Sequence, residues 1–267
     1  MTMERAMLDE ILALAQEAGR AVMAVYQSAD WGVDFKADNS PLTLADIASH
    51  KVISAGLARL YPEIPLLSEE SAAVDYEVRR GWQRFWLVDP LDGTKEFIKR
   101  NGEFTVNIAL IEQGRPVLGV VVAPVLRRAY FAARGVGAFA QEDAQAARPI
   151  QVASRTETAP WRVVASRSHS DARTEAFLAR LGNCELTSIG SSLKLCLVAA
   201  GEADVYPRFG PTMEWDTAAA QCVVECAGGV VCDLAGGALG YNKVQLLNPP
   251  FMVVPGGLQV ALRALLD

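Results

Sequence analysis

The chain has 267 residues, of which 51% are hydrophobic and 21% are charged, a composition too apolar for intrinsic disorder and sufficient for one or two packed domains. Its 25 basic and 31 acidic side chains leave a formal net charge of −6, which excludes generic binding to nucleic acid. An anionic substrate would therefore need a local source of positive charge, and a bound cation is the obvious candidate.

Membrane insertion and export are also disfavoured. The first residues are charged, and no apolar segment follows a basic start, which argues against a signal peptide. The longest apolar stretch, 117–126, is about half the length of a membrane span and contains Pro124. The five cysteines are an odd number without C-x-x-C spacing, so we expect reduced thiols. We predict a cytoplasmic protein without a membrane span, and leave open peripheral association with the inner face of the cell membrane.

Two helices are predicted in the first 60 residues. Apolar side chains recur at helical spacing along Ala6–Tyr26. After a polar loop at 32–42, Thr43 fits the N-cap of a second helix, which runs to about Leu60 and ends before Pro62. His50 lies in this helix between Ser49 and Lys51, and we predict that it faces solvent.

The rest of the chain divides into a part rich in strands and a part where strands and helices alternate. An apolar run at 85–88 is typical of a strand, and four more strands are expected to form an antiparallel sheet: 105–111, 116–122, 128–132 and 137–140. Beyond a boundary within 143–160, the pattern indicates strands at 162–165, 186–189, 204–206 and 230–232 and helices at 174–181, 192–200, 216–227 and 258–266. We predict an α+β N-terminal subdomain (1–153) and an α/β C-terminal subdomain (154–267) that form one continuous catalytic unit.

The most informative segment is 86–97, which reads W-L-V-D-P-L-D-G-T-K-E-F. A strand is expected to deliver Asp89 at its end, Asp92 follows three residues later, and Thr94 opens a helix. Two carboxylates this close repel each other unless cations lie between them, and oxygen ligands are what Mg²⁺ prefers. The start of the helix would also offer backbone N–H groups to a phosphate. Either carboxylate could instead simply cap a helix.

Two other junctions between strand and loop carry acids. Glu69 follows the apolar run 64–67, and Asp216 stands at the start of a predicted helix. Three acid-bearing junctions in a chain with only two histidines favour a hard-cation site over a zinc site.

These motifs resemble those of the lithium-sensitive, magnesium-dependent phosphomonoesterases typified by inositol monophosphatase, and most closely the 3′(2′),5′-bisphosphate nucleotidases of CysQ type within that family. The pattern D-P-[IL]-D-G-T matches 89–94, and W-D-x-A-[AG] matches 215–219. The similarity extends from the first helix to about Phe251. It implies a layered α-β-α-β-α sandwich of the sugar-phosphatase type, with two or three Mg²⁺ per site.

The resemblance also implies residue roles. Glu69, Asp89 and the carbonyl of Leu91 would hold one Mg²⁺, and Asp89, Asp92 and Asp216 would hold a second. Paired divalent ions can activate water and stabilise the leaving oxygen, so we expect in-line attack by water without a phosphoenzyme.

Asp46 matches the acid that pairs with Thr94 to activate the attacking water. The segment T-x-x-D at 43–46 is also a capping-box pattern, so a purely structural role competes with the catalytic one.

The resemblance favours a phosphorylated nucleotide as the substrate. It implies this substrate-binding set: Glu69, Leu91, Asp92, Gly93, Thr94, His169, Gly190, Ser191, Ser192, Lys194, Arg208 and Asp216. The leading hypothesis is hydrolysis of adenosine 3′,5′-bisphosphate to AMP and phosphate in sulfate assimilation, with activity on the sulfated donor nucleotide left open. The alternatives are an inositol-1-monophosphatase, a fructose-1,6-bisphosphatase, or a non-catalytic regulator that binds Mg²⁺ or nucleotide. Both a monomer and a homodimer are compatible with the sequence.

Overall fold

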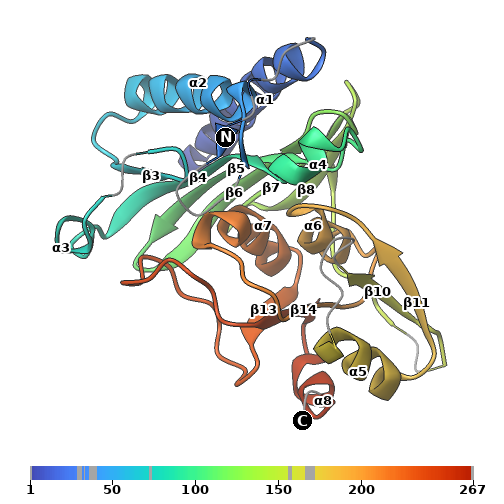
Figure 1. Ribbon diagram of the computed structural model, residues 1–267. Coiled ribbons are helices and arrows are strands. Elements are labelled where there is room, and N and C mark those ends of the chain that lie inside the picture. The colour runs from blue at the N-terminus through green and yellow to red at the C-terminus, as the bar shows by residue number, and fades with distance from the viewer. Residues whose placement is uncertain are drawn as a thin grey trace.

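The computed structural model describes residues 2–28, 32, 34–35, 41–71, 74–155, 158–165 and 172–265. Two long helices, α1 (Met3–Tyr26) and α2 (Leu44–Leu60), pack side by side on one face of a seven-stranded sheet (Figure 1). Helices α6 (Leu193–Ala199) and α7 (Glu214–Cys226) cover its other face. Both of the first two helices lie where periodicity predicts them, with Thr2 and Thr43 as N-caps.

The C-terminal strands form the next layer. On the side of these strands away from α6 and α7, helices α5 (Ala172–Leu181) and α8 (Gln259–Arg263) pack around a small apolar cluster that includes Phe177 and Leu262 (Figure 1). The resulting order of helix, sheet, helix, sheet and helix confirms the predicted α-β-α-β-α sandwich. No helix in the described ranges is long and apolar enough to cross a membrane.

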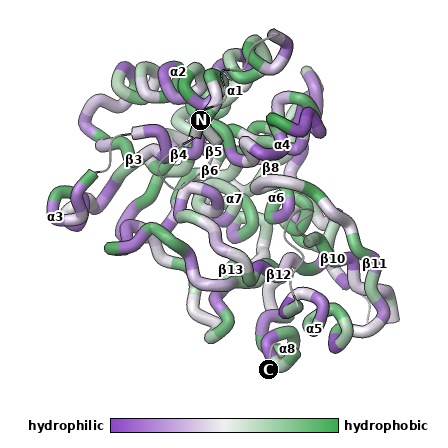
Figure 2. The backbone as a smooth tube through the Cα atoms, in the orientation of Figure 1, coloured by the Kyte–Doolittle hydropathy of each residue, from purple (hydrophilic) through white to green (hydrophobic). Residues whose placement is uncertain are grey.

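The large sheet follows the chain in simple order. Its strands are β3 (Leu66–Ser68), β4 (Arg84–Asp92), β5 (Thr105–Glu112), β6 (Arg115–Ala123), β7 (Arg128–Ala133), β8 (Gly137–Glu142) and β9 (Arg148–Pro149). Strands β3 and β4 are parallel and every later pair is antiparallel, which confirms the predicted antiparallel sheet. The central strands are apolar on both faces, as Figure 2 shows, because helices bury both sides.

The end of β4 differs from the expected turn. The strand continues through Pro90 to Asp92, and its pairing with β5 shifts register between Asp89 and Asp92. A register shift of this kind inserts extra residues into one strand and redirects its side chains. The two acids therefore stand on an irregular strand end and not on a free turn.

Several short elements were not predicted. They are β1 (Asp34–Phe35), β2 (Pro41–Leu42) and α3 (Tyr76–Arg79), whereas α4 (Thr94–Ile98) is the helix that Thr94 was expected to open.

The C-terminal half also departs from strict alternation. Strands β10 (Trp161–Ala165) and β11 (Cys184–Ser188) are parallel. In contrast, β12 (Tyr206–Arg208), β14 (Phe251–Pro255) and β13 (Gly229–Asp233) form an antiparallel sheet with β14 in the centre. Sequence analysis missed β14, although its apolar run F-M-V-V is a strand signal.

A close approach between β6 and α7 positions the second half of the molecule. Gly119 lies directly under α7, and a Cβ atom there would stand 2.1 Å from the carbonyl oxygen of Ala219. Only glycine lets the helix backbone come this near to the strand. The same helix carries Asp216 in its first turn, so this contact sets the depth at which that acid meets the large sheet.

Candidate active site

Three carboxylates lie close together at the C-terminal end of β4 in the large sheet. Asp89 and Asp92 come from β4 and Asp216 comes from α7, and one oxygen of each lies within 4.8 Å of the others. Burial is the main cause that raises the pKa values of Asp89 and Asp216 well above the usual range, and neighbouring carboxylates add to it. A partly buried set of oxygen donors whose negative charges repel one another suits a hard divalent cation. The residues present therefore fit a divalent metal.

Local turn chemistry holds the β4 acids in place. The backbone N–H of Leu91 donates to Asp89 Oδ1 at 3.0 Å. Gly93 adopts φ +93°, a left-handed conformation that costs little without a side chain, and the chain then enters α4. At its start the hydroxyl of Thr94 lies 3.4 Å from the carbonyl oxygen of Leu91. The motif is thus a strand end folded back onto the beginning of a helix.

Asp46 contacts this turn from α2. Its Oδ2 accepts hydrogen bonds from the backbone N–H and the hydroxyl of Thr43, at 2.7 and 2.6 Å, which completes a capping box. Its Oδ1 lies 3.3 Å from the hydroxyl of Thr94. Burial raises the pKa of Asp46 to about 6, although the bonds from Thr43 act in the opposite direction. The capping role and the contact with Thr94 are both present.

Glu69 lies next to the cluster. Its backbone N–H donates to the carbonyl of Val88 at 3.1 Å, one step beyond the pairing of β3 with β4. Its charge contributes to the raised pKa values of Asp46, Asp89 and Asp216. The parallel pairing of two short strands therefore brings this acid to the site.

His50, which the sequence suggested to be solvent-facing, is half-buried. Its Nδ1 is 3.0 Å from the hydroxyl of Ser68, and burial lowers the pKa of its imidazole. The interpretation from helix position alone was wrong because β3 packs beside α2.

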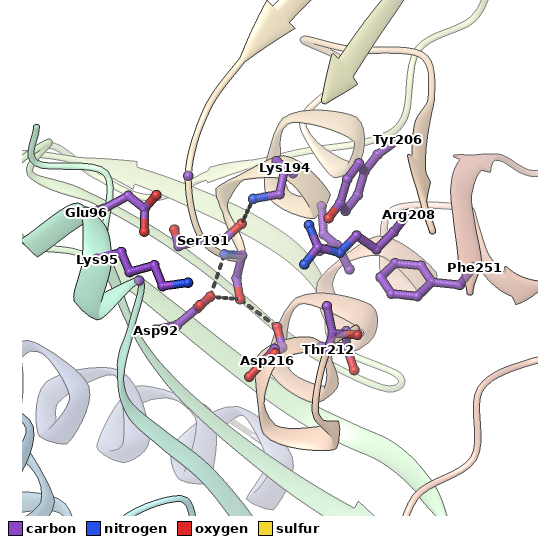
Figure 3. Close-up of a pocket in the computed structure, with 15 residues that line it drawn as sticks. Asp92, Lys95, Glu96, Ser191, Lys194, Tyr206, Arg208, Thr212, Asp216 and Phe251 are labelled. Atoms are coloured by element: carbon purple, nitrogen blue, oxygen red, sulfur yellow. Dashed lines mark hydrogen bonds between the residues drawn. The ribbon is translucent and has the colours of Figure 1, made fainter. Parts of the chain in front are cut away.

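A pocket opens beside the carboxylates. Helix starts α4, α6 and α7 and strands β12 and β14 surround it, and Figure 3 shows their side chains. Eight of the expected substrate-binding residues line it: Asp92, Gly93, Gly190, Ser191, Ser192, Lys194, Arg208 and Asp216. Three others, Glu69, Leu91 and Thr94, lie around the carboxylate cluster, and His169 lies outside the described residues.

The opposite part of the pocket is cationic and aromatic. Lys194 is buried, and its ammonium donates to the carbonyl of Ser191 at 2.7 Å and lies 5.7 Å from the ring centre of Tyr206. Burial lowers the pKa of Lys194 to about 8. Arg208 donates to the carbonyl of Gly210 at 3.1 Å, and its side chain lies beside that of Tyr206 (Figure 3). An anionic group in the pocket would therefore meet two fixed positive charges.

Sequence analysis missed one polar residue beneath the site. Asn107 on β5 is 1% exposed, and its amide nitrogen donates to the hydroxyl of Ser192 at 2.8 Å. The signal was a polar residue within the otherwise apolar run T-V-N-I-A-L-I.

Comparisons with known proteins agree with this site. The model of the inositol monophosphatase family matches residues 4–264. The 3′(2′),5′-bisphosphate nucleotidase CysQ of Escherichia coli K12 is 54% identical over 249 residues, which cover 92% of this chain and 99% of that protein. The crystal structure of CysQ from Bacteroides thetaiotaomicron, described as a bacterial member of the inositol monophosphatase family, superposes with a TM-score of 0.82 at 45% identity and covers 95% of this chain and 98% of its own. The extragenic suppressor protein suhB of Bartonella henselae superposes equally well, with a TM-score of 0.82 at 27% identity and 98% of both chains covered. A match along nearly the whole length, with the acids of both motifs in one cluster, means that this chain belongs to the inositol monophosphatase family.

Proposed function

We propose that this protein is a Mg²⁺-dependent phosphomonoesterase that hydrolyses adenosine 3′,5′-bisphosphate to AMP and phosphate. The observation that carries the proposal is a pocket with a cluster of acids at one end and the charges of Lys194 and Arg208 at the other. A metal cluster alone can serve a single phosphate, whereas two additional cations, of which Lys194 is buried and Arg208 is partly exposed, favour a substrate with a second phosphate. The names of the relatives that are about half identical to this chain support the same substrate.

The acids would hold the metal. We assign Glu69, Asp89 and the Leu91 carbonyl to one Mg²⁺ and Asp89, Asp92 and Asp216 to a second, with two or three ions per site. Bound divalent cations supply a lowered pKa for water and neutralise charge on the phosphoryl oxygens. The raised pKa values of Asp89 and Asp216 support this assignment because burial and neighbouring carboxylates outweigh the influences that lower them, including the charge of Arg208 near Asp216.

Asp46 and Thr94 would prepare the attacking water. With its hydroxyl hydrogen directed to Asp46 Oδ1 and not to the carbonyl of Leu91, Thr94 would have an oxygen lone pair free to accept a hydrogen bond from water. Asp46, with a pKa of about 6, is mostly ionised above neutral pH and can take up the proton that the attacking water releases through Thr94. We retain in-line attack by water. Hydrolysis of a chiral phosphate ester in labelled water should invert the configuration at phosphorus, and retention would contradict direct attack.

The pocket residues would bind the nucleotide. Gly93, Gly190 and Ser191, which line the pocket, would surround the scissile phosphate. Lys194 and Arg208 would bind the second phosphate, beside the aromatic side chain of Tyr206. Activity on the sulfated donor nucleotide is compatible with the same contacts.

A phosphate-release panel with Mg²⁺ tests the proposal. We expect a kcat/KM at least about tenfold higher for adenosine 3′,5′-bisphosphate than for inositol 1-phosphate, fructose 1,6-bisphosphate or NADP. Lys194→Met should lower kcat/KM for the bisphosphorylated nucleotide at least about tenfold and affect inositol 1-phosphate much less. Lys51→Met, an exposed lysine on α2, is the matched control. A preference for inositol 1-phosphate would favour the inositol phosphatase alternative. If the wild type releases no phosphate and Asp92→Asn does not differ from it, the result would favour a non-catalytic regulator.

Four further expectations stay predictions. They are the division at 153/154, the choice between monomer and homodimer, the cytoplasmic location and peripheral association with the membrane.

A further inference from the structure

We infer that Asn107 and Ser192 are positioning residues that hold the carboxylate of Asp92 and tie it to α7, so that they control the affinity for divalent cations. The inference rests on the proposed metal site. It departs from the expectation that the hydroxyl of Ser192 binds the substrate, and it assigns a role to Asn107.

Ser192 makes two hydrogen bonds to one oxygen of Asp92. Its backbone N–H and its hydroxyl lie 2.6 and 2.7 Å from Asp92 Oδ2. The same hydroxyl lies 2.7 Å from the main-chain carbonyl oxygen of Asp216. Ser192 is 2% exposed and stands immediately before α6. One hydroxyl thus joins an acid of β4 to the helix that carries another acid of the cluster.

Asn107 orients this hydroxyl from below. Its amide nitrogen donates to Ser192 Oγ at 2.8 Å, so the hydroxyl hydrogen must point away from Asn107, toward Asp92 or the carbonyl of Asp216. The amide also lies 3.4 Å from Asp92 Oδ2, and the hydroxyl of Thr105 is 3.5 Å from the same oxygen. A chain of donors inside the protein polarises each successive bond.

The donors leave Asp92 with one oxygen for a cation. Among the described residues, every hydrogen bond to its carboxylate ends on Oδ2, and none ends on Oδ1. These bonds restrict rotation of the carboxylate and would leave Oδ1 as the oxygen available to a cation. Partners that orient metal ligands in this way typically change metal affinity 10–100-fold when they are removed.

Metal binding without substrate is the direct test. Chelator-treated wild type, Ser192→Ala and Asn107→Leu would be titrated with Mg²⁺ and with Mn²⁺ in a calorimeter. We expect each variant to bind about 10–100-fold more weakly. Ser192→Thr keeps the hydroxyl and should bind within about threefold of wild type. The double variant should bind little more weakly than either single variant, because both remove the same chain of bonds. Ser54→Ala, whose hydroxyl bonds only within α2, is the control.

Kinetics separate positioning from substrate contact. With saturating Mg²⁺, Ser192→Ala should regain much of its kcat and show a KM for adenosine 3′,5′-bisphosphate within about twofold of wild type. Unchanged metal affinity together with a raised KM would overturn the inference and make Ser192 a substrate contact. If Ser192→Ala does not fold, Asn107→Leu decides the question by the same criteria. A wild type that binds no divalent cation would overturn the proposed function itself, whereas normal wild-type binding with unaffected variants overturns only this inference.

Discussion

The two oxygens of Asp46 have separate partners, and the Oδ1 atom lies 3.3 Å from the hydroxyl of Thr94. Oδ2 is occupied by Thr43, the N-cap of α2. The capping box therefore orients the carboxylate so that its other oxygen, Oδ1, faces the turn at the end of β4. A local structural motif and the proposed catalytic contact use the same side chain without conflict.

Replacing Asp46 should lower the activity and raise the stability of the protein at pH 7.5. The pKa of this carboxyl rises from 3.8 to about 6 on folding, so the folded state binds the proton more tightly and stability falls as pH rises through this window. Above pH 6 the penalty is at most about 3 kcal/mol. Asp46→Asn, without added metal, should therefore have a higher Tm than wild type at pH 7.5 and an equal one below pH 4. Its kcat should fall at least about 100-fold. A lower Tm at pH 7.5 would contradict the buried-charge argument.

Removal of divalent cations should destabilise the protein, and more so at higher pH. Protons and cations compete for Asp89 and Asp216, whose pKa values are raised by burial and by neighbouring acids. At pH 7.5, Mg²⁺ at about 100 times its Kd should add about 2.7 kcal/mol over the chelated protein. The Tm difference between loaded and chelated samples should shrink toward pH 5. Measuring this difference at each pH cancels the contribution of groups outside the site. His50 is one of them, because its lowered pKa makes the folded protein more stable as pH rises, whereas raised carboxyl pKa values make it less stable. A difference independent of pH would contradict binding at these acids.

The packing of α7 on β6 should tolerate no side chain at Gly119. Gly119→Ala places a methyl group 2.1 Å from a carbonyl oxygen of α7, so the helix must move away from the sheet. We expect a loss of about 3 kcal/mol or more in the free energy of unfolding, by denaturant titration. Metal affinity should fall as well, because the same helix carries Asp216. Gly81→Ala is the control, since, apart from its chain neighbours, no atom of the described residues lies within 4 Å of a Cβ there.

A buried hydroxyl links α2 to the acidic motif. Ser49 donates to the carbonyl of Pro90 at 2.7 Å, and Ser49 is fully buried. Ser49→Ala leaves that carbonyl without its partner and should cost about 1–3 kcal/mol in the free energy of unfolding. Ser54→Ala on the same helix should change stability by less than about 0.5 kcal/mol. Equal effects of the two substitutions would show that the link to Pro90 is unimportant.

Two of the acids that we propose as metal ligands, Asp89 and Asp92, stand out in the sequence because the motif that carries them is local. The segment 89–94 holds two acids, a proline, a glycine and a threonine within six positions, and the long helices follow from apolar periodicity. Local spacing also predicted the capping box of Thr43 and Asp46. These features depend only on neighbours along the chain, where backbone geometry is nearly fixed.

Relationships across the fold required the tertiary structure. The chain of bonds from Asn107 through Ser192 to Asp92 joins residues from three elements, and the closeness of His50 to Ser68 depends on how α2 packs on the sheet. The central position of β14 likewise follows from strand pairing and not from the composition of the strand. Sequence patterns determined which side chains could serve the site. Packing decided which of them meet, because long-range contacts are set by the burial of whole helices and strands and leave no periodic signal along the chain.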